Sequence, residues 1–213
     1  MSQKIDFDSP THEVTALKFK PVGVQVEIDG EIIGILDMAE FHHLKGDKLT
    51  DSQLEAVCDN ARRFGARLKA ARSLSAQSYT EKGLVQKLRQ KGIDGDAAKE
   101  AAEYYTTRGY INDDDFAENK AVALHSRKNY GRRRIYSELL RLGVTADTAK
   151  AVLDGLPPDR EALDRALIRR KVGDLTDRKE KERQYRHFMG QGFSGEDIRS
   201  ALKGDIEEEY YDD

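Results

Sequence analysis

Residues 84–93 read Leu84-Val-Gln-Lys-Leu-Arg-Gln-Lys-Gly-Ile93, a helical run that ends at a glycine followed by an apolar residue. The pattern returns at Gly143-Val144 and at Gly192-Phe193, so the glycines are 51 and 49 residues apart. The flanking positions repeat too: Leu88, Leu139 and Phe188 precede the glycines by four residues, and Ala98, Ala149 and Ile198 follow them. A period of this length predicts tandem supersecondary units in which glycine, as a left-handed stop, ends one helix of each unit.

The composition indicates a soluble chain with thin cores. Of its 213 residues, 38% are apolar and 35% are charged. The single cysteine, Cys58, excludes a disulfide framework and a cysteine-based zinc site. No basic leader precedes an apolar stretch, and no apolar run could span a bilayer. We therefore expect a cytoplasmic protein with no membrane partner, no metal and no cofactor.

The net charge of −3 hides a division along the chain. Residues 1–59 carry a net charge of −7, residues 60–203 carry +10, and residues 204–213 carry −6. A basic middle between acidic ends suggests a body that faces a polyanion or an acidic partner. A well-solvated helical surface with mixed charges is the alternative.

A β module is predicted near the start of the chain. After a polar arm at residues 1–12, Val22 to Ile28 alternate apolar and polar side chains, and Asp29-Gly30 precedes a second β-rich run. Asp-Gly between two such runs predicts a hairpin. A lone hairpin is marginally stable, so we expect a third strand, from Val14 to Lys20, or a covering helix. The module should span residues 13–49, with a short helical turn from Met38 to Leu44.

The rest of the chain reads as mainly α, in three tandem three-helix repeats. A capping box, Thr50 to Gln53, opens the first long helix, to about Leu74. Asp159 is expected to cap the helix that opens the third repeat, and Gly204 to end its last helix near residue 203. The predicted repeats are residues 50–109, 110–158 and 159–204, followed by an acidic tail at 205–213 without periodicity, which we expect to be disordered.

Candidate catalytic or metal-binding residues find simpler explanations. Asp113-Asp114-Asp115 point in three directions on a helix and suit its N-terminus, which Asn112 or Asp113 would cap. His42-His43 are adjacent, a poor spacing for metal ligands. No phosphate-binding loop, nucleophile elbow or plausible catalytic set occurs, so the sequence gives no positive reason to predict an enzyme.

The strongest candidate for binding is a basic patch within residues 127–134. Its members are Arg127, Lys128, Tyr130, Arg132, Arg133 and Arg134. The last three open a helix, where positive charge opposes the helix dipole, so something else should keep them there. A helix start also offers free backbone N–H groups to an anion, and arginine suits phosphates or carboxylates. We expect exposed arginines that bind a partner; a solvated surface is the alternative.

A second basic run has a structural explanation. It extends from Arg165 to Arg186, and much of it follows i, i+4 spacing with acids, which favours pairing within helices. Most tyrosines at helix ends or on apolar faces should be core residues with a solvated hydroxyl. Tyr130 differs because basic residues flank it.

Three segments together resemble the RecX family of bacterial recombinase regulators. They are residues 79–92, from Tyr79 through Gln86-Lys-Leu-Arg to Gly92; residues 108–117, with Arg108-Gly-Tyr-Ile-Asn; and residues 128–143, with Lys128-Asn-Tyr-Gly-Arg-Arg-Arg. The Asp29-Gly30 hairpin also looks like that family's N-terminal extension. The resemblance covers about residues 20–203. It implies an elongated, curved array of three-helix units with no catalysis of its own.

The resemblance further implies a partner, a RecA-type recombinase filament on single-stranded DNA. The regulator would limit filament growth, ATP hydrolysis and strand exchange, could contact the DNA directly, and is expected to be a monomer when free. The alternative is an autonomous DNA-binding helical module in which the same basic patch binds phosphates. An adaptor for another acidic protein is a third reading that composition leaves open.

Overall fold

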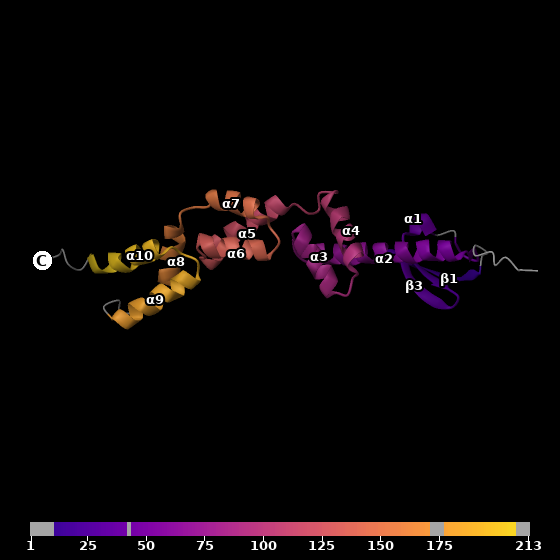
Figure 1. Cartoon of the computed structure of the whole chain (residues 1–213), viewed down its shortest axis with the longest axis horizontal. Helices are drawn as coiled ribbons and strands as arrows, with labels where there is room; N and C mark the ends of the chain where they lie inside the picture. Colours follow the sequence, from indigo (N-terminus) through magenta and orange to yellow (C-terminus); the bar gives the residue numbers. More distant parts are fainter. Residues whose placement is uncertain (1–10, 42–43, 171–176, 208–213) are drawn as a thin grey trace, which may run out of the picture. The chain divides into compact units, whose positions relative to one another are not determined.

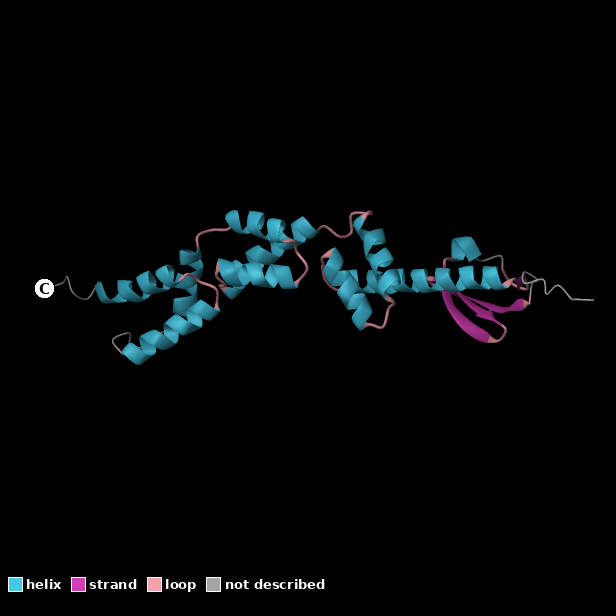
Figure 2. Ribbon diagram, in the orientation of Figure 1, coloured by secondary structure: helices cyan, strands magenta, loops and turns pink. Residues whose placement is uncertain are grey.

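The computed structural model describes residues 11–41, 44–170 and 177–207 (Figures 1 and 2). It divides into two compact units, Met1–Ile111 and Asn112–Asp213. The first contains a β-sheet and one three-helix repeat, and the second contains two three-helix repeats. The mainly helical fold class is thereby confirmed. None of the described helices combines the length with the apolar composition that a bilayer-spanning helix requires.

The N-terminal module is a four-stranded antiparallel sheet in the order β3-β2-β1-β4. Its strands are β1 (His12–Lys20), β2 (Gly23–Ile28), β3 (Glu31–Leu36) and β4 (Lys48–Leu49), with the short helix α1 (Met38–Phe41) between β3 and β4. The hairpin is confirmed: Asp29 and Gly30 have φ of 51° and 85°, as its tight turn requires. The third strand is confirmed as β1. The pairing of β4 with β1 was not predicted, because a two-residue strand has no periodicity.

Helix α2 (Asp51–Leu74) joins the sheet to the first repeat. Its predicted capping box is present, with the Thr50 side chain accepting the Gln53 N–H and the Gln53 side chain accepting the Thr50 N–H. Val57 and Ala61 pack in the core of the sheet, whereas Ala66 and Ala70 pack in the core of the repeat. The helix continues through Gly65 without a break. One helix therefore supplies both cores, and Figure 2 shows the sheet beside its N-terminal half.

The remaining helices complete the three-helix repeats. In the first unit they are α3 (Glu81–Gln90) and α4 (Gly95–Thr106). In the second unit they are α5 (Asp113–Lys128), α6 (Arg132–Arg141), α7 (Ala146–Asp154), α8 (Asp159–Arg170), α9 (Arg178–Gly190) and α10 (Gly195–Glu207). Asn112 caps α5 by accepting the N–H groups of Asp114 and Asp115, which confirms the structural reading of the aspartates.

The three glycine stops are confirmed and share one geometry. Gly92, Gly143 and Gly192 have φ of 76°, 100° and 92°, in the left-handed region that glycine adopts without strain. The N–H that follows each glycine donates to the carbonyl five residues earlier, on Leu88, Leu139 and Phe188 at 3.1, 3.1 and 3.3 Å. These bonds define Schellman motifs, which satisfy carbonyls left free at a helix end. The side chains of the same three residues are buried in the cores.

Two expectations about the third repeat are wrong. Helix α10 continues through Gly204 to Glu207, because a single glycine costs a helix only about 1 kcal/mol and does not by itself end it. Asp159 does not cap α8, since its carboxylate binds the start of α6 instead. His42, His43 and residues 208–213 lie outside the described residues.

In the first unit His12 forms hydrogen bonds to both Asp29 and Asp51, an arrangement that we call the histidine clasp. The His12 Nδ1 lies 2.7 Å from Asp29 Oδ2, and its Nε2 lies 3.0 Å from Asp51 Oδ1. These hydrogen bonds, first that to Asp29, raise the pKa of His12 above its ordinary value of 6.5. The stabilisation by imidazolium is therefore fully present below pH 6.5 and is lost as the pH rises through the raised pKa.

We expect amide exchange in β1 and β2 to accelerate over that pH window, after correction for intrinsic exchange rates. His12→Gln should remove the pH dependence, and added salt should weaken it because Asp51 is exposed. The same pH profile in the variant and the unchanged chain would contradict a role for the clasp.

Candidate functional site

The basic patch surrounds the turn at residues 129–131, between α5 and α6. Asn129 ends α5 with φ of 52°, and Gly131 precedes the first residue of α6. The Gly131 N–H donates to the carbonyl of Gln191 at 2.9 Å. A Cβ atom on Gly131 would lie 2.4 Å from the carbonyl oxygen of Gly192, so only glycine fits this close approach. The turn of the second repeat therefore lies directly on the glycine stop of the third.

The backbone N–H groups at the start of α6 are already bonded within the chain. The Arg132 N–H donates to Asp159 Oδ2 at 3.1 Å, and the Arg133 N–H donates to the carbonyl of Gly192 at 3.3 Å. The expectation that this helix start offers free donors to an external anion is wrong. An intramolecular anion, the Asp159 carboxylate, occupies the position, and it offsets the unfavourable charge of the arginines at the positive end of the helix dipole.

Two of the predicted site residues, Arg132 and Arg134, also bind carbonyl groups. The Arg132 Nη2 donates to the carbonyls of Leu156 and Pro157 at 2.6 and 3.3 Å, just beyond the end of α7. The Arg134 Nη1 donates to the Gly190 carbonyl at 3.2 Å and to Gln191 Oε1 at 3.1 Å, at the end of α9. Both cations therefore lie where helix carbonyl groups carry partial negative charge.

Tyr130 is held by one of these arginines. It is half-buried against the core of the second repeat, and the Arg134 guanidinium carbon lies 4.0 Å from its ring centroid. This cation–π contact occupies one face of the ring. Tyr130, Arg132 and Arg134 thus have structural contacts that account for their position, whatever else they bind.

The other three predicted site residues have exposed side chains. Arg127, Lys128 and Arg133 form no ion pair with any residue in the described ranges. Two arginines of α8 lie beside the end of α5: Arg165 Nε donates to Asn129 Oδ1 at 3.2 Å, and Arg169 Nη1 donates to the Arg127 carbonyl at 3.5 Å. We name Arg127, Lys128 and Arg169 the α5–α8 cluster.

Sequence reasoning placed Arg165 and Arg169 in the second basic run and did not connect them with the patch. Their i, i+4 spacing puts both side chains on one face of α8. This spacing is the sequence feature that could have indicated that they act together. Pairing within helices is confirmed for several members of that run, at distances of 3.8, 3.2 and 2.7 Å in the pairs Arg165–Glu161, Arg178–Glu182 and Arg183–Glu180. Arg169 forms no such pair among the described residues, so it adds a cation to the α5–α8 cluster.

Three polar side chains near the same turn are wholly or partly buried. His125 and Asn129 are buried, and Asp159 is half-buried. Burial lowers the pKa of His125, and it raises the pKa of Asp159 against the opposing effect of the Arg132 N–H and guanidinium. Burial therefore disfavours the charged form of both side chains, and for Asp159 the Arg132 N–H and guanidinium offset part of this effect.

The fold and its basic turn define a tandem three-helix-repeat protein, and comparison with known proteins identifies its family. Family models for the first, second and third three-helix domains of RecX match residues 66–104, 112–153 and 161–202. The chain is 31% identical over 186 residues to a regulatory protein RecX of Caldanaerobacter subterraneus, covering 83% of this chain and 90% of that protein. The chain belongs to the RecX family.

Further relatives agree with this assignment. A regulatory protein RecX of Chromobacterium violaceum is 33% identical over 146 residues, covering 68% of this chain and 93% of the relative. A crystal structure of regulatory protein RecX superposes with a TM-score of 0.68 at 17% identity, covering 91% of this chain and 100% of the other. A crystal structure of RecX from Lactobacillus salivarius superposes with a TM-score of 0.55 at 21% identity, covering 68% of this chain and 97% of the other. At these identities the two structures support the fold alone.

The close approach of the two turns predicts that Gly131→Ala will destabilise the second unit. The Cβ atom would displace the Gly192 carbonyl and should reduce the free energy of unfolding by about 1–3 kcal/mol, the usual cost of overpacking. Gly190→Ala is the matched control, because its Cβ would meet no atom within 4 Å. Urea denaturation of both variants measures the difference. Equal midpoints would show that the contact between the turns contributes little.

Proposed function

We propose that this chain is a non-enzymatic regulator that binds a RecA-type recombinase filament on single-stranded DNA and mostly inhibits its ATP hydrolysis, growth and strand exchange. The observation that carries the proposal is the match of all three RecX repeat models, in order, to the three repeats of this chain. The relatives are named regulatory proteins, which supports a regulatory role. The basic middle of the chain suits a partner that contains nucleic acid.

The cations that remain exposed are the contact residues we propose. Arg127, Lys128 and Arg133 have no intramolecular ion pair among the described residues, and they flank the turn at residues 129–131, which contacts the third repeat. Arg132 and Arg134 act instead as positioning residues, because their guanidinium groups bind carbonyls of the chain. Tyr130 contacts Arg134 through its ring, over which the Arg134 guanidinium carbon lies.

The test is inhibition of RecA ATPase activity on single-stranded DNA. A chain with Arg127→Ala, Lys128→Ala and Arg133→Ala should need at least about tenfold more protein for half-inhibition, since three exposed charge contacts of up to 1 kcal/mol each are lost. Lys150→Ala is the matched control, because Lys150 is an exposed cation on α7 that is not one of the patch residues. Inhibition by the triple variant equal to that of the control would remove these residues from the interface. No inhibition by the unchanged chain at stoichiometric ratios would contradict the function itself.

The second candidate is autonomous DNA binding through the same cations. Exposed arginine and lysine without intramolecular partners favour it, because phosphate neutralisation dominates such binding. A salt titration on bare single-stranded DNA separates the two functions. Tight binding with a steep salt dependence and no recombinase present supports the autonomous module, whereas binding that becomes tight only on filaments supports the regulator.

A further inference from the structure

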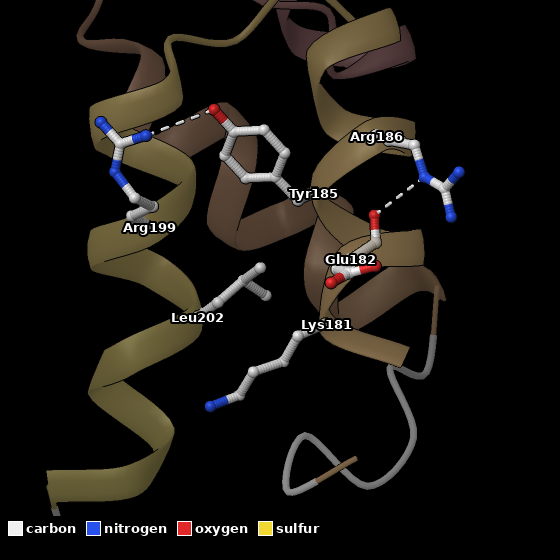
Figure 3. Close-up of a pocket in the computed structure, with 6 residues that line it drawn as sticks. All are labelled: Lys181, Glu182, Tyr185, Arg186, Arg199 and Leu202. Atoms are coloured by element: carbon white, nitrogen blue, oxygen red, sulfur yellow. Dashed lines mark hydrogen bonds between the residues drawn. The ribbon is translucent and has the colours of Figure 1, made fainter. Parts of the chain in front are cut away.

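The third repeat contains a cavity of about 530 Å³ between α9 and α10 (Figure 3). Figure 3 shows Tyr185 and Leu202 directed into the space between these helices, with Lys181 extending from α9 toward α10. The Tyr185 hydroxyl accepts a hydrogen bond from Arg199 Nη1 at 3.3 Å. The floor is therefore aromatic and aliphatic, and cations stand around it. None of its lining residues belongs to the basic patch described above.

The charges around the cavity are unbalanced. Lys181, Arg186 and Arg199 line it with one acid, Glu182, whose carboxylate lies 3.2 Å from Arg178. Lys181 and Arg199 form no ion pair with any residue whose side chain the structure describes. A ligand that fits would combine a flat apolar group for Tyr185 and Leu202 with carboxylates for the cations.

The residues that follow α10 have this chemistry. They read Glu208-Glu-Tyr-Tyr-Asp-Asp213, with four carboxylates around two adjacent phenol rings. Helix α10 itself supplies Arg199 and Leu202 and runs to Glu207. From Leu202 to Glu207 the helix advances about 7.5 Å, whereas six extended residues reach about 20 Å. The segment can therefore return to the cavity without any movement of α10.

We propose that residues 208–213 bind in cis in the cavity between α9 and α10, with the tyrosines on Tyr185 and Leu202 and the carboxylates at Lys181 and Arg199. Attachment to α10 gives the segment a millimolar effective concentration, so weak intrinsic affinity suffices for occupancy. The bound segment would neutralise cations of the third repeat and withhold them from any other polyanion. This inference does not depend on the proposed function, since the binding involves only this chain.

The test uses a fluorescein-labelled peptide with the sequence of residues 207–213, followed by fluorescence anisotropy. It is added to the full-length chain and to a full-length chain with Glu208→Gln, Glu209→Gln, Tyr210→Ser, Tyr211→Ser, Asp212→Asn and Asp213→Asn. The neutral-tail chain should bind the peptide saturably. The unchanged chain should bind it at least about tenfold more weakly, because its own segment competes at high effective concentration.

Charge reversal in the neutral-tail chain locates the site. Lys181→Glu with Arg199→Glu should abolish peptide binding, whereas Lys179→Glu, an exposed change on the same helix that does not line the cavity, should leave it intact. A peptide with both tyrosines replaced by serine tests the apolar contact without altering the protein, and it should not bind. Equal binding to the two full-length chains, no binding to the neutral-tail chain, or retained binding after charge reversal would each overturn the proposal. A competition by the unchanged chain's own segment that becomes stronger as the protein concentration rises would also overturn the proposal. In that case the segment would bind a second copy of the chain.

Discussion

The closure of helix ends at three glycines is the constraint on which the repeat structure depends. At each stop, one residue four positions before the glycine does two things at once: its carbonyl accepts the N–H beyond the glycine, and its side chain fills the core. The apolar residue after the glycine packs in the same core, as Phe193 does against Phe188 with ring centroids 6.2 Å apart. At each stop, the hydrogen bonding of the backbone and the burial of an apolar side chain thus depend on the same residue. The direction of the next helix therefore follows from the position of the last turn of the preceding helix.

Two different kinds of contact join modules within the two units. In the first unit, α2 is long enough to contribute apolar side chains to the sheet core and then to the helical core. In the second unit, the repeats are joined at the Gly131 turn largely by hydrogen bonds to Gln191, Gly192 and Asp159. An apolar joint tolerates changes of shape among similar residues, whereas a polar joint requires each donor to meet its acceptor once water is excluded. The second joint is accordingly the more specific in its residue types.

Local features of the fold could be read from the sequence, and tertiary ones could not. The glycine stops, the Asp29-Gly30 hairpin and the Thr50 capping box depend on residues within a few positions of one another, and all were predicted. The carbonyl partners of Arg132 and Arg134 lie about 24 and 56 positions away, and no periodicity in the chain indicates them. The conflict between the arginines and their helix dipole did indicate that a partner exists, but it could not say that the partner is Asp159 of the same chain. The end of α10 was misplaced because glycine is a strong stop only where the following residues make the Schellman bonds.

The same contacts change what the basic composition means for binding. A count of arginine and lysine treats every cation as available to a polyanion, yet a guanidinium that already binds helix carbonyls would have to give up those bonds first. Arg132 and Arg134 belong to this group, and Arg165, Arg178 and Arg183 are paired with acids on their own helices. Among the described residues of the second unit, the cations with neither an ion pair nor a carbonyl partner include Arg127, Lys128 and Arg133 near the Gly131 turn, and Lys181 and Arg199 at the α9–α10 cavity. A partner that recognises the second unit through charge can bind these positions without breaking an ion pair, whereas Arg132 and Arg134 would first have to release the carbonyl groups that they bind.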